Sequence, residues 1–169
     1  MKSTDQAPFR QSPPGHPPAG RPQMPLRTTL LRHQTDLGGP EAHFDWLLEP
    51  DDGDSDPDRR DVATWRCQRR PDLLEIGESA VLVPIPPHRR WWLGFPIGAS
   101  RPLTPPLGTA TVVSRGQAGL QSTVPMEIQV SWSQSPEVHR LRIEEPTPDR
   151  HLVIRLDDHS MRNGTAGPS

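Results

Sequence analysis

The sequence predicts an all-β protein, a single closed or partly closed β-barrel of about six to eight strands with little helix. Apolar and polar residues alternate along many short segments, which is the period of a strand with one buried face. Breaks rich in proline and glycine separate these segments, and closure into a barrel would remove the exposed sheet edges. Only residues 71–79, with Asp72 as the candidate N-cap, are compatible with a short helix.

The expected strands follow one another along the chain. Seven of them alternate, namely 28–32, 42–48, 62–67, 109–114, 126–132, 138–143 and 151–156. Two further ranges, 79–85 and 89–95, are short apolar runs. The breaks fall at 38–40, 86–87, 105–108 and 116–119. The proline-rich stretch 96–107 is long for a barrel loop, and loops of that length are often functional or mobile.

Composition divides the 169 residues into a core and two polar ends. Residues 1–25 are rich in proline and poor in apolar residues, so they cannot offset the entropy of ordering, and we expect them to be disordered. The tail 159–169 is similar, which leaves 26–158 as the barrel domain. No apolar run could span a membrane, no signal peptide is visible and Cys67 is the only cysteine. We therefore expect a cytoplasmic protein without a membrane partner.

Charge gives a weaker indication of partners. The net charge is -2, so there is no global basic field that would favour nucleic acid. The basic side chains are nearly all arginine, Lys2 being the only lysine, and arginine suits bidentate contacts with phosphate. A biased genomic base composition would produce the same preference, so arginine content alone does not decide.

A candidate metal site comes from the spacing His-x-Asp. His43 and Asp45 are two apart, so in a strand they project from one face while Phe44 and Trp46 project from the other. His33, at the end of the preceding expected strand, reaches the same place if the two strands form a hairpin. Two imidazoles and a carboxylate suit Mn²⁺, Zn²⁺ or Fe²⁺. The alternative is a polar strand face without a function.

His88 is a candidate acid/base, since it follows two prolines and precedes Arg89 and Arg90. A cationic imidazole there would stabilise charge on a phosphoryl group or protonate a leaving oxygen. The alternative is a strand start with solvated charges. Trp91 and Trp92 are interpreted as core residues rather than as a platform for base stacking. The other four histidines receive no role.

Several segments in this order resemble the 3′-phosphoesterase domain family of bacterial DNA ligase D, which includes stand-alone DNA polymerase ligase-like proteins. That family shows a strand ending in His, an H-x-D-x-x-L-E strand, a tryptophan strand and a D-H strand that leads to an aromatic residue. The matching segments are LLRH at 30–33, HFDWLLE at 43–49, VATWR at 62–66 and PHRRWW at 87–92, with GTATVVSRG at 108–116 as a later strand. The resemblance covers residues 27–157.

The resemblance implies a barrel that holds one divalent metal, Mn²⁺ first, with Zn²⁺ or another transition metal as alternatives. It implies removal of a 3′-terminal phosphate or ribonucleotide from DNA or RNA ends in repair. The implied metal ligands are His33, His43 and Asp45, and His88 is implied to contact the scissile phosphate. Arg69 falls where the family often has a basic residue. Together with Arg89 and Arg90, it is expected to bind phosphate or nucleic acid.

The chain departs from the family in ways that leave other functions open. His33 and His43 are ten apart instead of six, although a longer turn costs little closure entropy. Leu47 replaces an arginine, Trp92 replaces a tyrosine, and the acidic residue after Phe95 is missing. One alternative is an inactive relative that binds nucleic-acid ends or a repair protein through an arginine-rich face. Another is a structural barrel with incidental histidines. We expect a monomer in each case.

Overall fold

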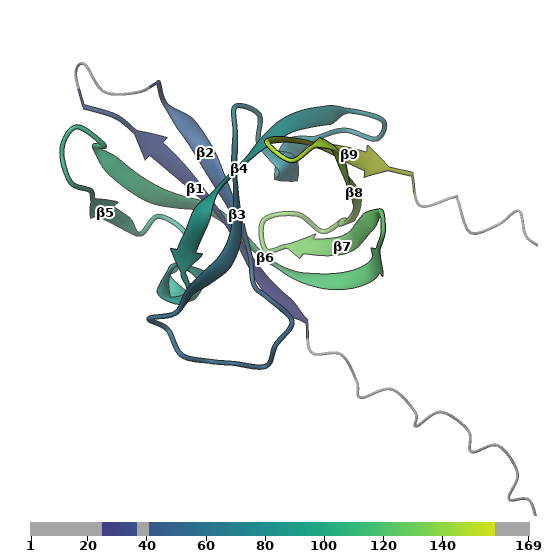
Figure 1. Ribbon diagram of the computed structural model, residues 1–169, viewed down its shortest axis with the longest axis horizontal. Coiled ribbons are helices and arrows are strands. Elements are labelled where there is room, and N and C mark those ends of the chain that lie inside the picture. The colour runs from purple at the N-terminus through teal and green to yellow at the C-terminus, as the bar shows by residue number, and fades with distance from the viewer. Residues whose placement is uncertain (1–24, 37–40, 158–169) are drawn as a thin grey trace, which may run out of the picture.

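The computed structural model describes residues 25–36 and 41–157, which form a closed antiparallel β-barrel (Figure 1). Eight strands close it in the order β1-β2-β3-β4-β9-β8-β7-β6, because β6 pairs back onto β1. The remaining strand, β5, lies outside the barrel and pairs with β6. The predicted all-β barrel is confirmed. The predicted disordered ends, apart from Pro25, and the predicted break at 38–40 lie outside the described residues.

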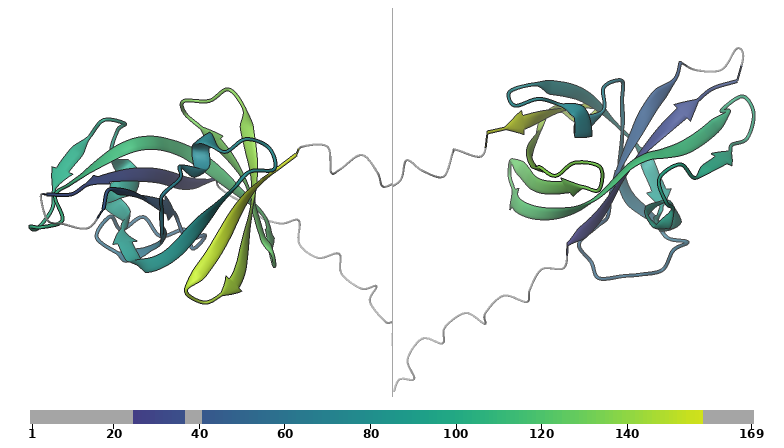
Figure 2. Two further views of the ribbon diagram at one scale, coloured as in Figure 1. Left: turned by 90° about the horizontal axis from the view of Figure 1, so that it is seen from above. Right: turned by 180° about the vertical axis from the view of Figure 1, so that it is seen from behind.

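The nine strands of the described chain are β1 (Leu26–Gln34), β2 (His43–Leu48), β3 (Arg60–Cys67), β4 (Ser79–Arg89), β5 (Ser100–Pro102), β6 (Thr109–Thr123), β7 (Met126–Trp132), β8 (Val138–Thr147) and β9 (Arg150–Leu156). Two short 3-10 helices interrupt them, η1 (Pro71–Leu73) and η2 (Arg90–Gly94). The β1–β2 hairpin and β5 project together from one end of the barrel (Figures 1 and 2). In the described part of the chain, no helix has the length and apolar character needed to cross a membrane.

The barrel interior is filled by one face of each strand. Trp46 and Leu48 of β2 pack there with Leu30, Leu82 and other apolar residues from all eight strands. Each such side chain contributes about 1.5–3 kcal/mol through removal from water. Trp46 also has a polar N–H, and the buried Nε1 donates to Thr28 Oγ1 at 2.8 Å. Trp65 Nε1 likewise donates to His151 Nδ1 at 3.0 Å, whereas the Nε1 of Trp132 has no hydrogen-bond partner among the described residues.

A second apolar cluster lies on the opposite face of β1, β2, β3 and β6. It consists of Leu31, Leu47, Val62, Ala110 and Val112, covered by Trp92 and Leu93 of η2. Leu47 is neighbour to Leu48 of the interior cluster, so the alternation of a strand between two faces builds both clusters. This cluster fixes η2 against the outer wall of the barrel, beside the β1–β2 hairpin.

Two predicted elements are wrong. Residues 89–95 were expected to form a strand, but Arg90–Gly94 form η2, where Arg90 is held by Asp52 and Asp61. The expected helix over 71–79 is only η1, because such a short segment has too few hydrogen bonds to offset nucleation. Asp72 does not cap it but forms an ion pair with Arg70 at 2.6 Å.

Two predicted breaks also lie inside strands. Pro86 and Pro87 belong to β4, whose pairing with β9 covers only Ser79 to Leu82, so the missing N–H groups leave no ladder bond unmade on that side. Gly116 lies within β6, where a Cβ would come 2.5 Å from the carbonyl oxygen of Ser131 on β7. That glycine permits close approach of two strands instead of making a turn.

Candidate metal centre

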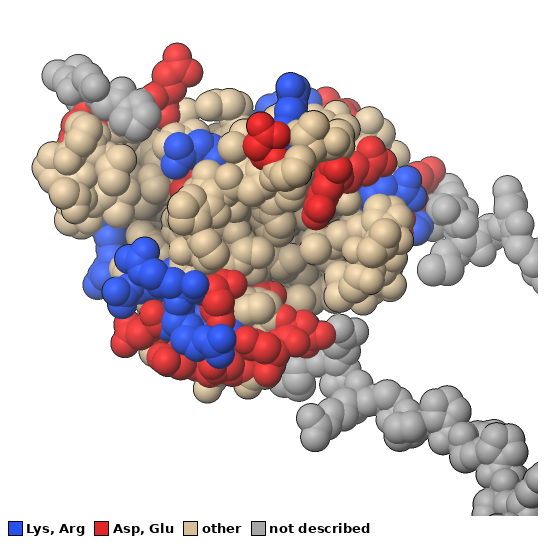
Figure 3. Space-filling model, in the orientation of Figure 1, with Lys and Arg blue, Asp and Glu red and all other residues tan. Residues whose placement is uncertain are grey.

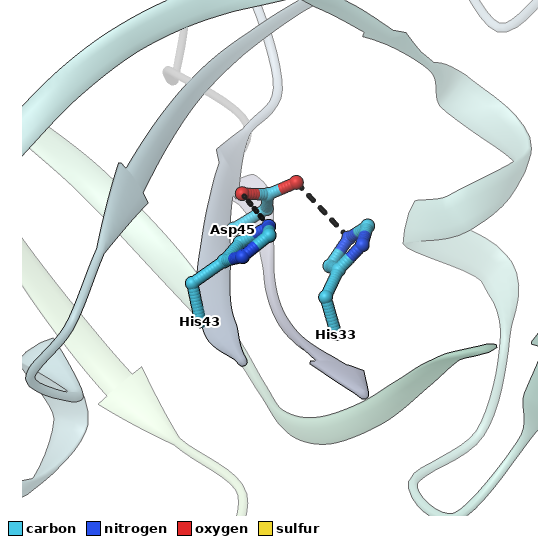
Figure 4. A group of neighbouring side chains, drawn as sticks. All are labelled: His33, His43 and Asp45. Atoms are coloured by element: carbon cyan, nitrogen blue, oxygen red, sulfur yellow. Dashed lines mark ion pairs between the residues drawn. The ribbon is translucent and has the colours of Figure 1, made fainter. Parts of the chain in front are cut away.

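The three predicted ligands converge at the end of the β1–β2 hairpin. His33 lies directly opposite His43 in the register of the two strands, and their rings stack with centroids 4.8 Å apart. Asp45 follows two residues later on the same face, as the His-x-Asp spacing predicted. One ligand atom from each residue lies within 4.8 Å of the others (Figure 4). The larger separation of His33 and His43 in sequence therefore does not separate them in space.

The ligand atoms are buried and lack hydrogen bonds. His33, His43 and Asp45 are 8%, 5% and 1% exposed. Among the described residues, His33 Nε2, His43 Nε2 and Asp45 Oδ2 have no hydrogen-bond partner, although His33 Nε2 lies only 3.0 Å from Asp45 Oδ2. A buried polar atom without a partner costs about 1–3 kcal/mol. Nitrogen and carboxylate atoms in this state fit a divalent transition-metal ion, which would satisfy all three.

The ring of His43 is oriented for this role by its other nitrogen. His43 Nδ1 lies 2.8 Å from the carbonyl oxygen of Glu41. Because a carbonyl oxygen can only accept, Nδ1 carries the proton and Nε2 keeps a lone pair on the side of Asp45. A backbone carbonyl that fixes the tautomer in this way is the usual companion of a metal-binding histidine.

The pKa values favour the protonation states that a metal requires. Burial lowers the pKa of His43, which favours the neutral imidazole. Burial alone would raise the pKa of Asp45, but His33, Arg66 and His88 outweigh it and hold that pKa below its usual value. Neutral imidazoles and an ionised carboxylate are the forms that bind metal.

His88 of β4 lies close to the three ligands, with too little space for a phosphate group between its imidazole and Asp45. Its Nε2 is 3.6 Å from Asp45 Oδ2, and its backbone N–H donates to Thr64 Oγ1 at 3.3 Å. Burial lowers the pKa of His88, so the neutral imidazole is favoured in place of the cationic one expected from the sequence. In this position His88 can accept a proton or approach a metal held by Asp45.

A pocket of about 660 Å³ opens beside the three ligands. Arginines line part of it, and Ile85, Pro86, Leu103 and Leu107 give it an apolar side. Trp92 is buried, as predicted for a core residue. Trp91 stacks on it with centroids 4.9 Å apart, and both tryptophans line the pocket. The pocket thus combines cationic and apolar walls, which suits an anionic ligand with a ring system.

The three arginines predicted to bind phosphate have different positions. Arg89 lines the pocket and forms an ion pair with Asp58 at 3.2 Å. Arg90 is 1% exposed and is bound by Asp52, Asp61 and the carbonyl oxygen of Asp54, so it does not reach the pocket. Arg69 does not line it either, since it pairs with Glu78 at 2.8 Å beyond η1.

Arg90 is therefore a structural residue that anchors the acidic loop between β2 and β3. Basic and acidic side chains gather over that loop at the lower left of Figure 3. Five aspartates at 51, 52, 54, 56 and 58 would repel one another without the arginines beside them. The sequence pattern around Arg90 did not show that the acidic loop would bind this arginine.

Three further arginines line the pocket without having been assigned a role from the sequence. They are Arg60, Arg66 and Arg101. Arg66 lies opposite Asp45 in the β2–β3 register, and its Nε is 3.4 Å from Asp45 Oδ1. That contact follows from the hairpin register, which the sequence pattern did not define closely enough.

Comparison with known proteins does not place the chain in a family. No family model matches it, and no curated protein sequence matches it significantly. Function is therefore inferred from the site and from the resemblance of the sequence segments.

Proposed function

We propose that this protein is a divalent-metal-dependent phosphoesterase that removes a phosphate or ribonucleotide from the 3′ ends of DNA or RNA during repair. One observation carries the proposal. Three buried ligand atoms without hydrogen bonds converge on the wall of a pocket that is also lined by arginines. The resemblance to the ligase D phosphoesterase domain supports the same activity.

Each residue at the site has a proposed role. A cation held by His33, His43 and Asp45, with Mn²⁺ proposed first and Zn²⁺ as the alternative, would neutralise charge on a phosphoryl group. Arg66 and Arg89 at the pocket wall provide N–H donors for phosphate oxygens. His88, with its pKa lowered by burial, would take or return a proton at the reacting phosphate.

A second candidate is an inactive relative that binds nucleic-acid ends. It is favoured by Leu47, which is fully buried in the outer apolar cluster where the resembling family has an arginine. Leu47 has no charge, so this position provides no guanidinium to bind a phosphate. The other pocket arginines would still bind an anionic strand, with affinity that falls as salt rises.

The deciding experiment is release of inorganic phosphate from a 3′-phosphorylated oligonucleotide in the presence of Mn²⁺. The wild-type protein is compared with Asp45→Asn, which keeps the side-chain shape but removes the charge, and with Arg69→Ala as a matched control outside the pocket. Release by wild type and Arg69→Ala, but not by Asp45→Asn, is expected. Salt-dependent binding without release would favour the binding module, and neither activity would leave a structural barrel.

A further inference from the structure

A row of four residues crosses four neighbouring strands at the candidate metal centre. His43 of β2 lies opposite His33 of β1, His33 lies opposite Ala110 of β6, and Ala110 lies opposite Arg101 of β5. Residues directly opposite one another in antiparallel strands project from the same face. Since neighbouring strands are about 4.8 Å apart, the backbones of His33 and Arg101 are separated by roughly 10 Å. Ala110, the residue between them in this row, is buried in the outer apolar cluster.

The guanidinium of Arg101 is held by aromatic rings. It lies 4.3 Å from the ring centroid of Trp91 and 5.2 Å from that of Phe95. Trp91 is itself stacked on the buried Trp92. A cation on an aromatic ring uses the flat face of the guanidinium, so the N–H donors around its edge remain available to an anion.

This arrangement differs from that of two other arginines at the pocket. Arg66 faces Asp45, and Arg89 faces Asp58, so each has a carboxylate beside it. The rings hold Arg101 in place without neutralising its charge. Arg101 is nevertheless exposed and lines the same pocket as His33, His43 and Asp45. A fixed, accessible guanidinium is suited to bidentate binding of phosphate.

We propose that Arg101 forms a second phosphate subsite, which binds the 5′-phosphate of the nucleotide whose 3′-phosphate lies at the candidate metal centre. The inference rests on the proposed function and specifies its substrate. The pocket of about 660 Å³, which both anion sites line, has room for the nucleoside between them. Leu103 and Leu107, which also line the pocket, supply apolar contact for its rings. The preferred substrate is then a strand end or a nucleoside 3′,5′-bisphosphate, and a nucleoside 3′-monophosphate binds less well.

The test uses two ligands that the protein cannot hydrolyse. Both are deoxyadenosine with a 3′-methylenephosphonate, one with a 5′-phosphate and one with a free 5′-hydroxyl. Binding is measured by calorimetry with Mn²⁺ present for wild type, Arg101→Ala, Arg101→Lys and the control Arg69→Ala. Circular dichroism and thermal melting confirm that each variant is folded.

In the wild type, the 5′-phosphate should increase affinity about tenfold or more, as expected for charge-assisted hydrogen bonds. Arg101→Ala should lose this increase while its affinity for the 5′-hydroxyl ligand stays within about twofold of wild type. Arg101→Lys should keep only part of the increase, because an ammonium lacks the planar fork. Arg69→Ala should behave as wild type.

Two outcomes would overturn the proposal, and they are distinguishable. If wild type binds both ligands equally, or Arg101→Ala retains the full increase, the second subsite is wrong while the metal site stands. If wild type binds neither ligand with Mn²⁺ present, the proposed function fails and the subsite fails with it.

Discussion

His33 Nε2 lies 3.0 Å from Asp45 Oδ2, yet neither atom has a hydrogen-bond partner among the described residues. Two polar atoms at that distance within a protein interior normally make a well-directed bond. Figure 4 shows the two side chains directed toward each other, with His43 beside them, and one ligand atom from each of the three residues lies within 4.8 Å of the others. That relationship is the one expected of ligands arranged around an ion, and it leads to the first prediction.

Mn²⁺ is expected to stabilise the folded protein, since it would bind the native state and not the unfolded chain. At a hundred times the dissociation constant the gain is about 2.7 kcal/mol. Melting temperature measured with Mn²⁺ and then with EDTA checks this. Asp45→Asn should lose the response, while Asp58→Asn, at a carboxyl group 78% exposed, should keep it. An equal rise in both variants would contradict the assignment of Asp45.

Acidification should destabilise the metal-free protein. Burial lowers the pKa values of His43 and His88 in the folded state, so between these values and about 6.5 the unfolded chain binds more protons. The contribution of both residues is therefore complete above pH about 6.5 and is lost as the pH falls through the lowered values. Asp45 acts in the same direction at lower pH, since its pKa is also lowered.

Urea unfolding at several pH values between about 5 and 8, in EDTA, measures this dependence. His88→Gln removes one of the two titrating imidazoles and should flatten the slope. Stability that increases on acidification over this range would show that the histidines are not held in their neutral form.

Arg90→Ala should be much more damaging than Arg69→Ala. Arg90 is 1% exposed and bound by Asp52 and Asp61. Removing Arg90 leaves these two carboxylates close together without the cation that holds them and also removes its contact with the carbonyl oxygen of Asp54, so we expect a clear loss of stability. Arg69 and Glu78 form an exposed pair, whose loss should change the free energy of unfolding little because water and salt screen it. Free energies of unfolding in urea compare the two, and similar losses would contradict a structural role for Arg90.

Strand periodicity predicted most of the barrel because each strand has one face in an apolar cluster. It failed at 89–95, where an apolar run is compatible with either strand or helix. The outcome there depends on Arg90 reaching Asp52 and Asp61, 38 and 29 residues earlier in the chain. The predicted break at Gly116 was also wrong, because this glycine lies inside β6 and allows β7 to approach closely. Both causes are long-range contacts that a local pattern does not contain.

The three candidate metal ligands could also be predicted from local patterns in the sequence. His43 and Asp45 share a face by local spacing, and a hairpin suffices to add His33. Arg101 could not be found in this way, because its alignment with His33 passes through Ala110 and needs two strand registers. One of these belongs to β5, which lies within a stretch predicted to be a loop.

The last prediction separates two roles that the position of His88 permits. With Nε2 at 3.6 Å from Asp45 Oδ2, His88 can act on the substrate or serve as a further metal ligand. If it transfers a proton, His88→Ala should reduce phosphate release by about 10²–10⁴-fold while the stabilisation by Mn²⁺ persists.

The lowered pKa of His88 implies a neutral imidazole in the free protein. A bound phosphate would raise that pKa again, so substrate binding should be accompanied by uptake of a proton. Calorimetry in buffers of different ionisation enthalpy detects this uptake. Loss of the Mn²⁺ response in His88→Ala would identify a ligand instead, and full activity in that variant would exclude both roles.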